Sequence, residues 1–136
     1  MKLARSFEQS IAIMIAIAKQ PVGNPIPANA LASKLNLSPT YSQKLLRKLV
    51  LAGLIKATPG VNGGFVLARH SNQISIVDIM QAVDETKHTF HPTGILELAN
   101  DSSEVTTEQI NRAFQTADLV WLQVLSQTKL SDLLLN

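Results

Sequence analysis

Apolar residues recur at intervals of three and four along the first twenty residues. The residues at this spacing are Phe7, Ile11, Met14, Ile15 and Ala18. Such a spacing places apolar side chains on one face of a helix and predicts a buried opening helix. The helix is expected to end near Lys19 or Gln20, because Pro21 disfavours helical backbone in the residue before it.

Two short helices joined by about three residues are predicted next. Pro27 suits a first helical turn, where its missing N–H costs nothing, and Asn36 suits a left-handed stop. Ser38 and Pro39 then have the residue types of an N-cap and first position for a helix that runs to about Ala52. So short a connection is typical of a helix-turn-helix motif.

A β-hairpin and a further short helix are predicted after the helix-turn-helix. Leu54–Thr58 and Phe65–Ala68 have the pattern of strands, and the turn-forming sequence PGVNGG lies between them. Ser75 and Asp78 form a capping box, which predicts a helix over Ile76–Val83.

The last third of the chain contains the longest amphipathic segment. Residues 85–104 show no steady period, apart from a helical turn expected at Ile95–Ala99. Thr106 and Gln109 have the spacing of another capping box, and apolar residues follow them at helical intervals. Those residues are Ile110, Ala113, Phe114, Ala117, Trp121, Val124 and Leu125. A short apolar piece over Leu130–Leu135 comes last.

These elements predict a mainly α fold with a small β-hairpin wing, in the α+β class. We expect residues 1–84 to form a winged helix-turn-helix domain, 85–105 a linker or sensor-type loop, and 106–136 a dimerisation helix and tail. A six-turn apolar helix at the end of a small domain needs a covering surface, and a second copy of the chain supplies one. The predicted dimerisation residues are Ile110, Phe114, Ala117, Trp121, Val124 and Leu125.

The distribution of charge says more than the net charge of +2. Six basic residues and no acidic ones lie between Lys34 and Arg69, whereas acidic residues dominate from Asp78 to Glu108. This asymmetry is expected when one face of a protein meets a polyanion. The alternative is a solvated basic surface with no partner.

Polar and basic residues of the helix after Ser38 lie largely off its leucine stripe, so they can enter the major groove of DNA. The glycine-rich wing tip can approach the minor groove, with Arg69 or Lys56 adding charge. The predicted DNA-binding residues are Ser38, Thr40, Tyr41, Gln43, Lys44, Arg47, Lys48, Asn62, Gly63, Gly64 and Arg69. The alternatives are an ordinary amphipathic surface helix and a plain hairpin loop.

Several other chemistries have no support in the sequence. The chain has no cysteine, which excludes disulfides, thiolate catalysis and cysteine-ligated clusters. No apolar run approaches the ~20 residues of a membrane-spanning helix. No catalytic or phosphate-binding motif is present. His88 and His91 are three residues apart, which allows a metal, but the absence of partners favours a structural or exposed role. We therefore expect no enzymatic activity, metal or cofactor.

The sequence resembles the Rrf2 family of bacterial winged-helix transcriptional regulators. The similar segments are MKLARSFEQSIAIMIAIA, LASKLNLSPTYSQKLLRKLVLAGLIKAT and GVNGGFVLARHSNQISIVDIMQAVD, which together cover most of residues 1–84. The resemblance implies a homodimer whose long C-terminal helices cross. It also implies a recognition helix over Ser38–Ala52 in the major groove and a role in gene repression or activation.

Two departures from the family pattern are visible. Many members bind an iron–sulfur cluster through three cysteines in the loop after the wing, but here that loop is TKHTFHPTGILELANDSSE, without cysteine. Members often carry an arginine early in the wing turn, where this chain has Thr58-Pro59-Gly60. The first departure removes the ligands of the cluster, and the second puts one wing contact to DNA in doubt.

The sequence therefore predicts a cytoplasmic, dimeric, cluster-free regulator that binds a pseudo-palindromic operator in double-stranded DNA, with repression favoured. The alternative is a winged-helix protein-interaction module that no longer reads DNA. No membrane contact is expected. The residues do not show whether the chain responds to a small-molecule effector, to another signal or to none.

Overall fold

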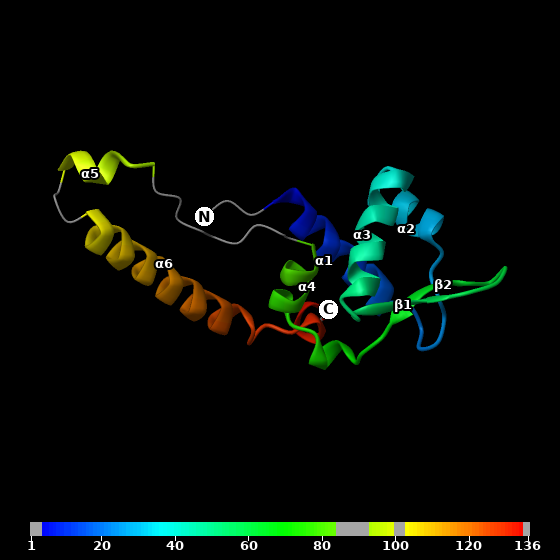
Figure 1. Cartoon of the computed structure of the whole chain (residues 1–136). Coiled ribbons are helices and arrows are strands. Elements are labelled where there is room, and N and C mark those ends of the chain that lie inside the picture. The colour runs from blue at the N-terminus through cyan, green and yellow to red at the C-terminus, as the bar shows by residue number, and fades with distance from the viewer. Residues whose placement is uncertain (1–3, 84–92, 100–102, 135–136) are drawn as a thin grey trace. The chain divides into compact units, whose positions relative to one another are not determined.

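The computed structural model describes residues 4–83, 93–99 and 103–134 (Figure 1). The chain divides into two compact units, one of residues 1–85 with 126–136 and one of residues 86–125. We call the first the winged unit and the second the long-helix unit. Each is described by itself.

The winged unit has the elements that the sequence predicts, with bounds shifted by a residue or so. Its helices are α1 (Arg5–Ala18), α2 (Ala28–Leu35), α3 (Pro39–Leu51) and α4 (Ile76–Val83), and its strands are β1 (Ile55–Thr58) and β2 (Gly64–Leu67). Two 3₁₀ turns, η1 (Ser71–Gln73) and η2 (Leu130–Leu134), complete it. The mainly helical fold with a two-stranded antiparallel wing is thus confirmed.

The predicted helix boundaries are stabilised by the side chains that suggested them. Asn36 ends α2 in left-handed backbone with φ of 54°. The Ser38 hydroxyl oxygen accepts a hydrogen bond from the Tyr41 N–H at 3.2 Å, as an N-cap should. Ser75 and Asp78 form the reciprocal capping box of α4: the Ser75 N–H donates to Asp78 Oδ2 at 2.9 Å, and the Asp78 N–H donates to Ser75 Oγ at 3.1 Å.

The wing is wider at its base than a two-stranded hairpin. β1 and β2 pair from Ile55 with Leu67 to Thr58 with Gly64. Ile26, in the connection between α1 and α2, adds a bridge to Phe65: its N–H donates to Phe65 O at 3.1 Å, and the Phe65 N–H donates to Ile26 O at 2.9 Å. The connection between α1 and α2 is therefore tied to the wing by backbone hydrogen bonds.

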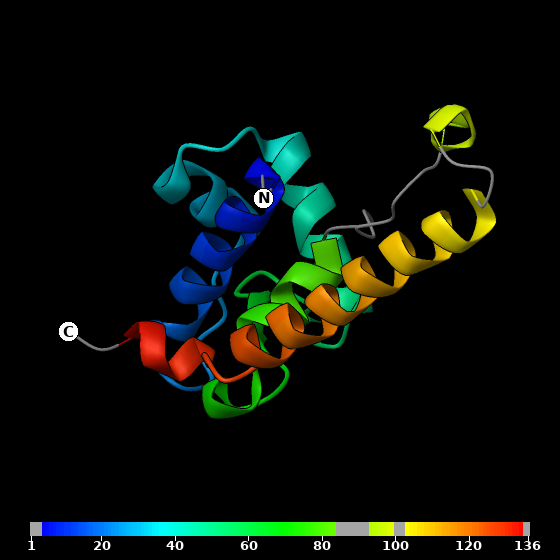
Figure 2. The ribbon, with the colours of Figure 1, turned by 90° about the vertical axis from the view of Figure 1, so that its left-hand side faces the viewer.

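The C-terminal tail packs on the winged unit, a return that the sequence pattern does not indicate. Ser75 and Lys129 form an antiparallel bridge, in which the Ile76 N–H donates to Thr128 O at 3.0 Å and the Leu130 N–H donates to Ile74 O at 2.7 Å. Leu130 is fully buried in the same core cluster as α1, α3 and α4. Figure 2 shows η2 beside the end of α1 and the segment that precedes α4.

The long-helix unit contains α5 (Ile95–Ala99) and α6 (Ser103–Leu125). α5 lies where a helical turn was expected. α6 begins earlier than predicted, so Thr106 is already inside the helix and the capping box assigned to Thr106 and Gln109 is wrong. Along α6 an exposed ion pair joins Arg112 to Glu108 at 2.8 Å. Within the described ranges, no helix is both long and apolar enough to cross a membrane.

Candidate nucleic-acid interface

α3 has one buried and one exposed face. Its buried residues, Ser42, Leu45, Leu46 and Leu49, recur at the three- and four-residue spacing of a helix. Ser42 is satisfied there, because its hydroxyl donates to the Pro39 carbonyl at 3.0 Å. The opposite face exposes Thr40, Gln43, Lys44 and Arg47. These four predicted DNA-binding side chains therefore lie together on one accessible surface.

Two other predicted residues of α3, Lys48 and Tyr41, are half-buried, and both contact other parts of the winged unit. The Lys48 ammonium donates to the carbonyl of Val83 at 3.5 Å. A cation at a helix C-terminus is stabilised by the carbonyl groups that the helix leaves unpaired. Lys48 thus links α3 to the end of α4, which the sequence did not indicate. Tyr41 is the other half-buried residue, and it packs against the core.

The wing tip exposes Asn62 but uses its glycines for its own fold. Gly60 has φ of 106°, and its carbonyl accepts a hydrogen bond from the Gly63 N–H at 3.0 Å. A Cβ at Gly63 would collide with the backbone of Thr58, and a Cβ at Gly64 would collide with the backbone of Ile26. Gly63 is buried and Gly64 half-buried, so their expected contact with DNA stays a prediction, whereas their role in the turn is direct.

Five of the six basic residues between Lys34 and Arg69 are exposed. Lys34 at the end of α2, Lys56 on β1 and Arg69 after β2 are all exposed, as are Lys44 and Arg47. No acidic residue occurs between Glu8 and Asp78. The exposed surface of α2, α3 and the wing therefore carries positive charge without compensating carboxylates.

The predicted dimerisation residues fall on one stripe of α6, spanning about 100° at 3.6 residues per turn. Phe114 and Val124 are 51% and 59% exposed, Ala117 is also exposed, and the other three are half-buried. Leu98 of α5 is 88% exposed, an apolar residue that the sequence pattern did not single out. Its helix is too short for a periodic signal to appear.

The residues present do not match an iron–sulfur cluster ligated by cysteines. The chain has no cysteine, and no three potential ligands among histidines and carboxylates come together in the described parts of the chain. His88 and His91 lie outside the described residues.

Comparison with known proteins identifies the family. The family model described as "Rrf2: Iron-dependent Transcriptional regulator" matches residues 3–136. The chain is 31% identical over 134 residues to the putative HTH-type transcriptional regulator YffB of Lactococcus lactis, covering 97% of this chain and 86% of YffB. It is 33% identical over 138 residues to the HTH-type transcriptional regulator IscR of Cereibacter sphaeroides, covering 100% of this chain and 88% of IscR.

A solved structure supports the same conclusion. CymR, described as the global cysteine regulator of B. subtilis, matches with a TM-score of 0.70 and 28% identity over 98% of this chain and 96% of CymR. The agreement covers the winged helix-turn-helix and the C-terminal helix alike. The chain belongs to the Rrf2 family of DNA-binding transcriptional regulators.

Proposed function

We propose that this chain acts as a homodimeric repressor that binds a pseudo-palindromic operator and needs no iron–sulfur cluster. The observation that carries the proposal is the exposed face of α3. There Thr40, Gln43, Lys44 and Arg47 lie opposite the buried leucine stripe, in a region of the chain without acidic residues.

The residues of that face, and the hydroxyl-bearing residues at the start of α3, have groups that suit contacts with DNA. Arg47 and Lys44 have the donors to read guanine, and the Gln43 amide has both donor and acceptor to read adenine. Ser38, Thr40 and Tyr41 carry hydroxyls that can meet phosphate oxygens and fix the position of the helix. Asn62 at the wing tip and Arg69 at the base of β2 extend the contact to the adjacent minor groove and backbone.

The α6 helices supply the dimer in this proposal. Phe114, Trp121 and Val124 of one protomer cover those of its partner, and the two copies of α3 then face half-sites about 34–36 Å apart, one helical turn of DNA. A dimer bound across a promoter excludes the polymerase, which is repression. The chain acts in the cytoplasm, where the bacterial chromosome lies, and performs no catalytic step.

Selection of bound DNA from a random duplex pool tests the proposal. The wild-type protein should enrich a pseudo-palindrome whose half-site spacing reports the dimer geometry. Arg47→Ala should enrich the site more weakly and accept any base at the position that Arg47 reads, whereas Arg112→Ala, the same change on α6, should enrich the wild-type site. Failure of the wild-type protein to enrich any site overturns DNA reading, and enrichment of a single half-site overturns the dimer.

The second candidate, a protein-interaction module, has one observation in its favour. Leu51 at the end of α3 and Val61 at the wing tip are 77% and 103% exposed, so apolar side chains lie where DNA contacts are expected. If these residues meet a protein, Leu51→Lys with Val61→Lys abolishes that complex. If they meet DNA, the added charges strengthen its binding.

A further inference from the structure

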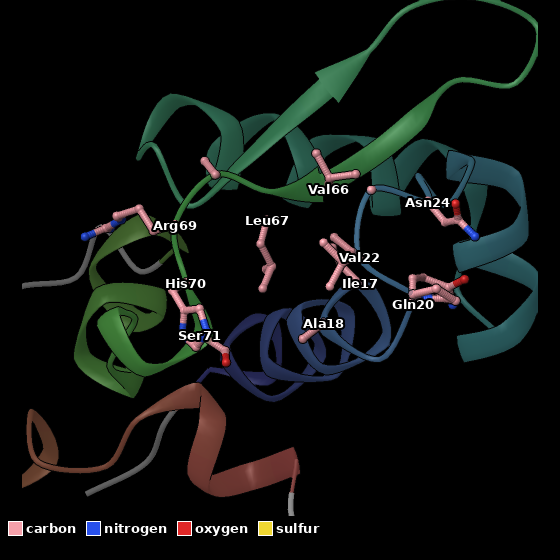
Figure 3. Close-up of a pocket in the computed structure, with 13 residues that line it drawn as sticks. Ile17, Ala18, Gln20, Val22, Asn24, Val66, Leu67, Arg69, His70 and Ser71 are labelled. Carbon is pink, nitrogen blue, oxygen red and sulfur yellow. The ribbon is translucent and has the colours of Figure 1, made fainter.

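A hollow of about 410 Å³ lies between the C-terminal end of α1, the connection after it, and β2 (Figure 3). Ile17 and Ala18 form one wall, and Val66 and Leu67 form the other. Leu67 points into the hollow in Figure 3. All of its lining residues belong to the winged unit, and none was singled out as an effector site by the sequence.

The rim of this hollow is polar and carries positive charge. Arg69, His70 and Ser71 line one end, and Gln20 and Asn24 line the other. The His70 Nδ1 accepts a hydrogen bond from the Asn72 N–H at 3.2 Å, so the neutral ring carries its proton on Nε2 and can donate from it. An apolar interior with a few polar groups at its edges is the usual form of a small-molecule site.

The positive charge around the hollow favours an anionic ligand. No carboxylate occurs from residue 9 to residue 77, the segment that contains the whole hollow. The Arg69 side chain points outward from the rim in Figure 3. Within the described part of the chain its guanidinium forms no ion pair with a carboxylate. An exposed arginine can swing over a bound anion and form charge-assisted hydrogen bonds with it.

We propose that this hollow binds a small carboxylic acid with a short aliphatic body. The body packs against Ile17 and Leu67, and the carboxylate meets Arg69 and the His70 N–H. A volume near the lower end of the ordinary range for ligand sites, about 300–1,000 Å³, fits a small metabolite rather than a nucleotide.

The same ligand would lower the affinity for DNA, a consequence that rests on the proposed function. Arg69 is among the predicted DNA contacts. Its guanidinium cannot form its full set of hydrogen bonds with a ligand carboxylate and with a DNA phosphate at the same time. The connection that lines the hollow also pairs with the wing, because Ile26 and Phe65 exchange backbone hydrogen bonds just beyond the lining residues. A ligand wedged between α1 and β2 therefore acts on the base of the wing.

Titration of the ¹⁵N-labelled full-length chain with hexanoate tests the site without DNA. Amides of residues 17–24 and 66–71 should shift and saturate. Acetate lacks the aliphatic body and hexanol lacks the charge, so each should bind at least about tenfold more weakly. Equal responses to hexanoate and hexanol, or shifts that do not saturate in these amides, overturn the proposal.

Two variants locate the site. Arg69→Gln should weaken hexanoate binding about tenfold, the loss of one charge-assisted contact. Val22, wholly exposed beside the hollow, can be changed without loss of packing, so Val22→Glu should repel the carboxylate and weaken binding by at least as much. Val61→Glu, an equally exposed valine at the wing tip, is the control and should bind hexanoate like wild type. Equal weakening in Val61→Glu and Val22→Glu contradicts the assignment.

A DNA measurement then tests the regulation separately. At matched ionic strength, hexanoate should raise the Kd for the selected operator by about tenfold relative to acetate, since one phosphate contact is lost. Arg69→Gln should bind the operator more weakly and should respond to hexanoate much less than the wild-type protein does. Operator binding without hexanoate binding overturns the site alone, whereas hexanoate binding without operator binding overturns the proposed function alone.

Discussion

The winged unit and the long-helix unit each contain an amphipathic helix, but the two helices differ in how far their apolar faces are buried. α3 and α6 both carry apolar residues at helical spacing, yet the stripe of α3 is buried, whereas Phe114, Ala117 and Val124 in the stripe of α6 are exposed. Every buried apolar residue in the described part of the chain belongs to the winged unit. The pattern of a helix therefore reveals that it has an apolar face, but the rest of the chain decides what covers that face.

The exposed apolar residues sharpen this contrast. Leu119, Val120 and Val124 of α6 are 69%, 56% and 59% exposed, and Leu98 of α5 is 88% exposed. In the winged unit the large exposed apolar residues are scattered: Leu51 ends α3, whereas Val22 and Val61 lie in connections. Several large apolar residues left exposed along one helix are typical of an interaction site. The long-helix unit is therefore the part of the chain that we expect to need a second copy.

The largest expected effect is on the dimer. Val124→Glu places a charge in the proposed interface, which should cost at least about 3 kcal/mol and raise the dimer dissociation constant by about a hundredfold or more. Sedimentation velocity over a range of concentrations measures it. Val22→Glu makes the same change at an exposed valine of the winged unit and should leave the dimer intact. Equal dissociation in both variants would remove α6 from the interface.

The next effect is on the stability of the winged unit. Leu130→Ala removes a fully buried side chain and should lower the free energy of unfolding by about 2–5 kcal/mol, measured by urea denaturation. Leu133→Ala, three residues along the same tail, changes a side chain that is 37% exposed and should cost much less. If the two variants unfold alike, the tail does not pack into the core as described.

Removal of an arginine from the exposed face of α3 should lower DNA affinity more than removal of an arginine from α6. Arg47→Ala removes an exposed α3 contact and should weaken operator binding by about 1–3 kcal/mol, that is, about tenfold to a hundredfold. Fluorescence anisotropy with labelled operator measures it. Arg112→Ala removes the same side chain from α6 and should change the affinity little. A larger loss of affinity for Arg112→Ala than for Arg47→Ala would show that the DNA-binding surface lies on the long-helix unit.

The smallest effect compares capping with an exposed ion pair. Ser75→Ala removes the hydroxyl that caps α4 and should cost about 1 kcal/mol of unfolding free energy. Glu108→Gln breaks the exposed pair with Arg112 on α6 and should cost no more than about 0.5 kcal/mol. Urea denaturation at constant protein concentration compares them. A greater loss in Glu108→Gln would mean that this pair lies within a covered surface.

Local features of the fold were predictable from the sequence because their causes are local. Asn36, Ser38 and the pair Ser75 and Asp78 act on backbone within three residues of themselves, so the sequence alone indicates where helices begin and end. The exposed face of α3 was predictable for the same reason, since helical periodicity separates Lys44 and Arg47 from the leucine stripe.

Long-range contacts were not predictable. The Ile26–Phe65 bridge, the Lys48–Val83 hydrogen bond and the return of Leu130 to the core join residues 35 or more positions apart. No spacing rule reaches so far. The wing glycines illustrate the consequence: Gly64 suggested close approach to DNA, whereas the structure shows its close approach to Ile26.

The central claim is that the winged unit reads DNA and that α6 joins two protomers. The most direct test compares the affinity of Val124→Glu for a single half-site with its affinity for the full palindrome. This variant should bind a half-site as wild type does and no longer prefer the palindrome, because α3 and the wing are intact and only the pairing of protomers is lost. Wild-type preference for the palindrome in Val124→Glu, or loss of half-site binding in a folded variant, would contradict it.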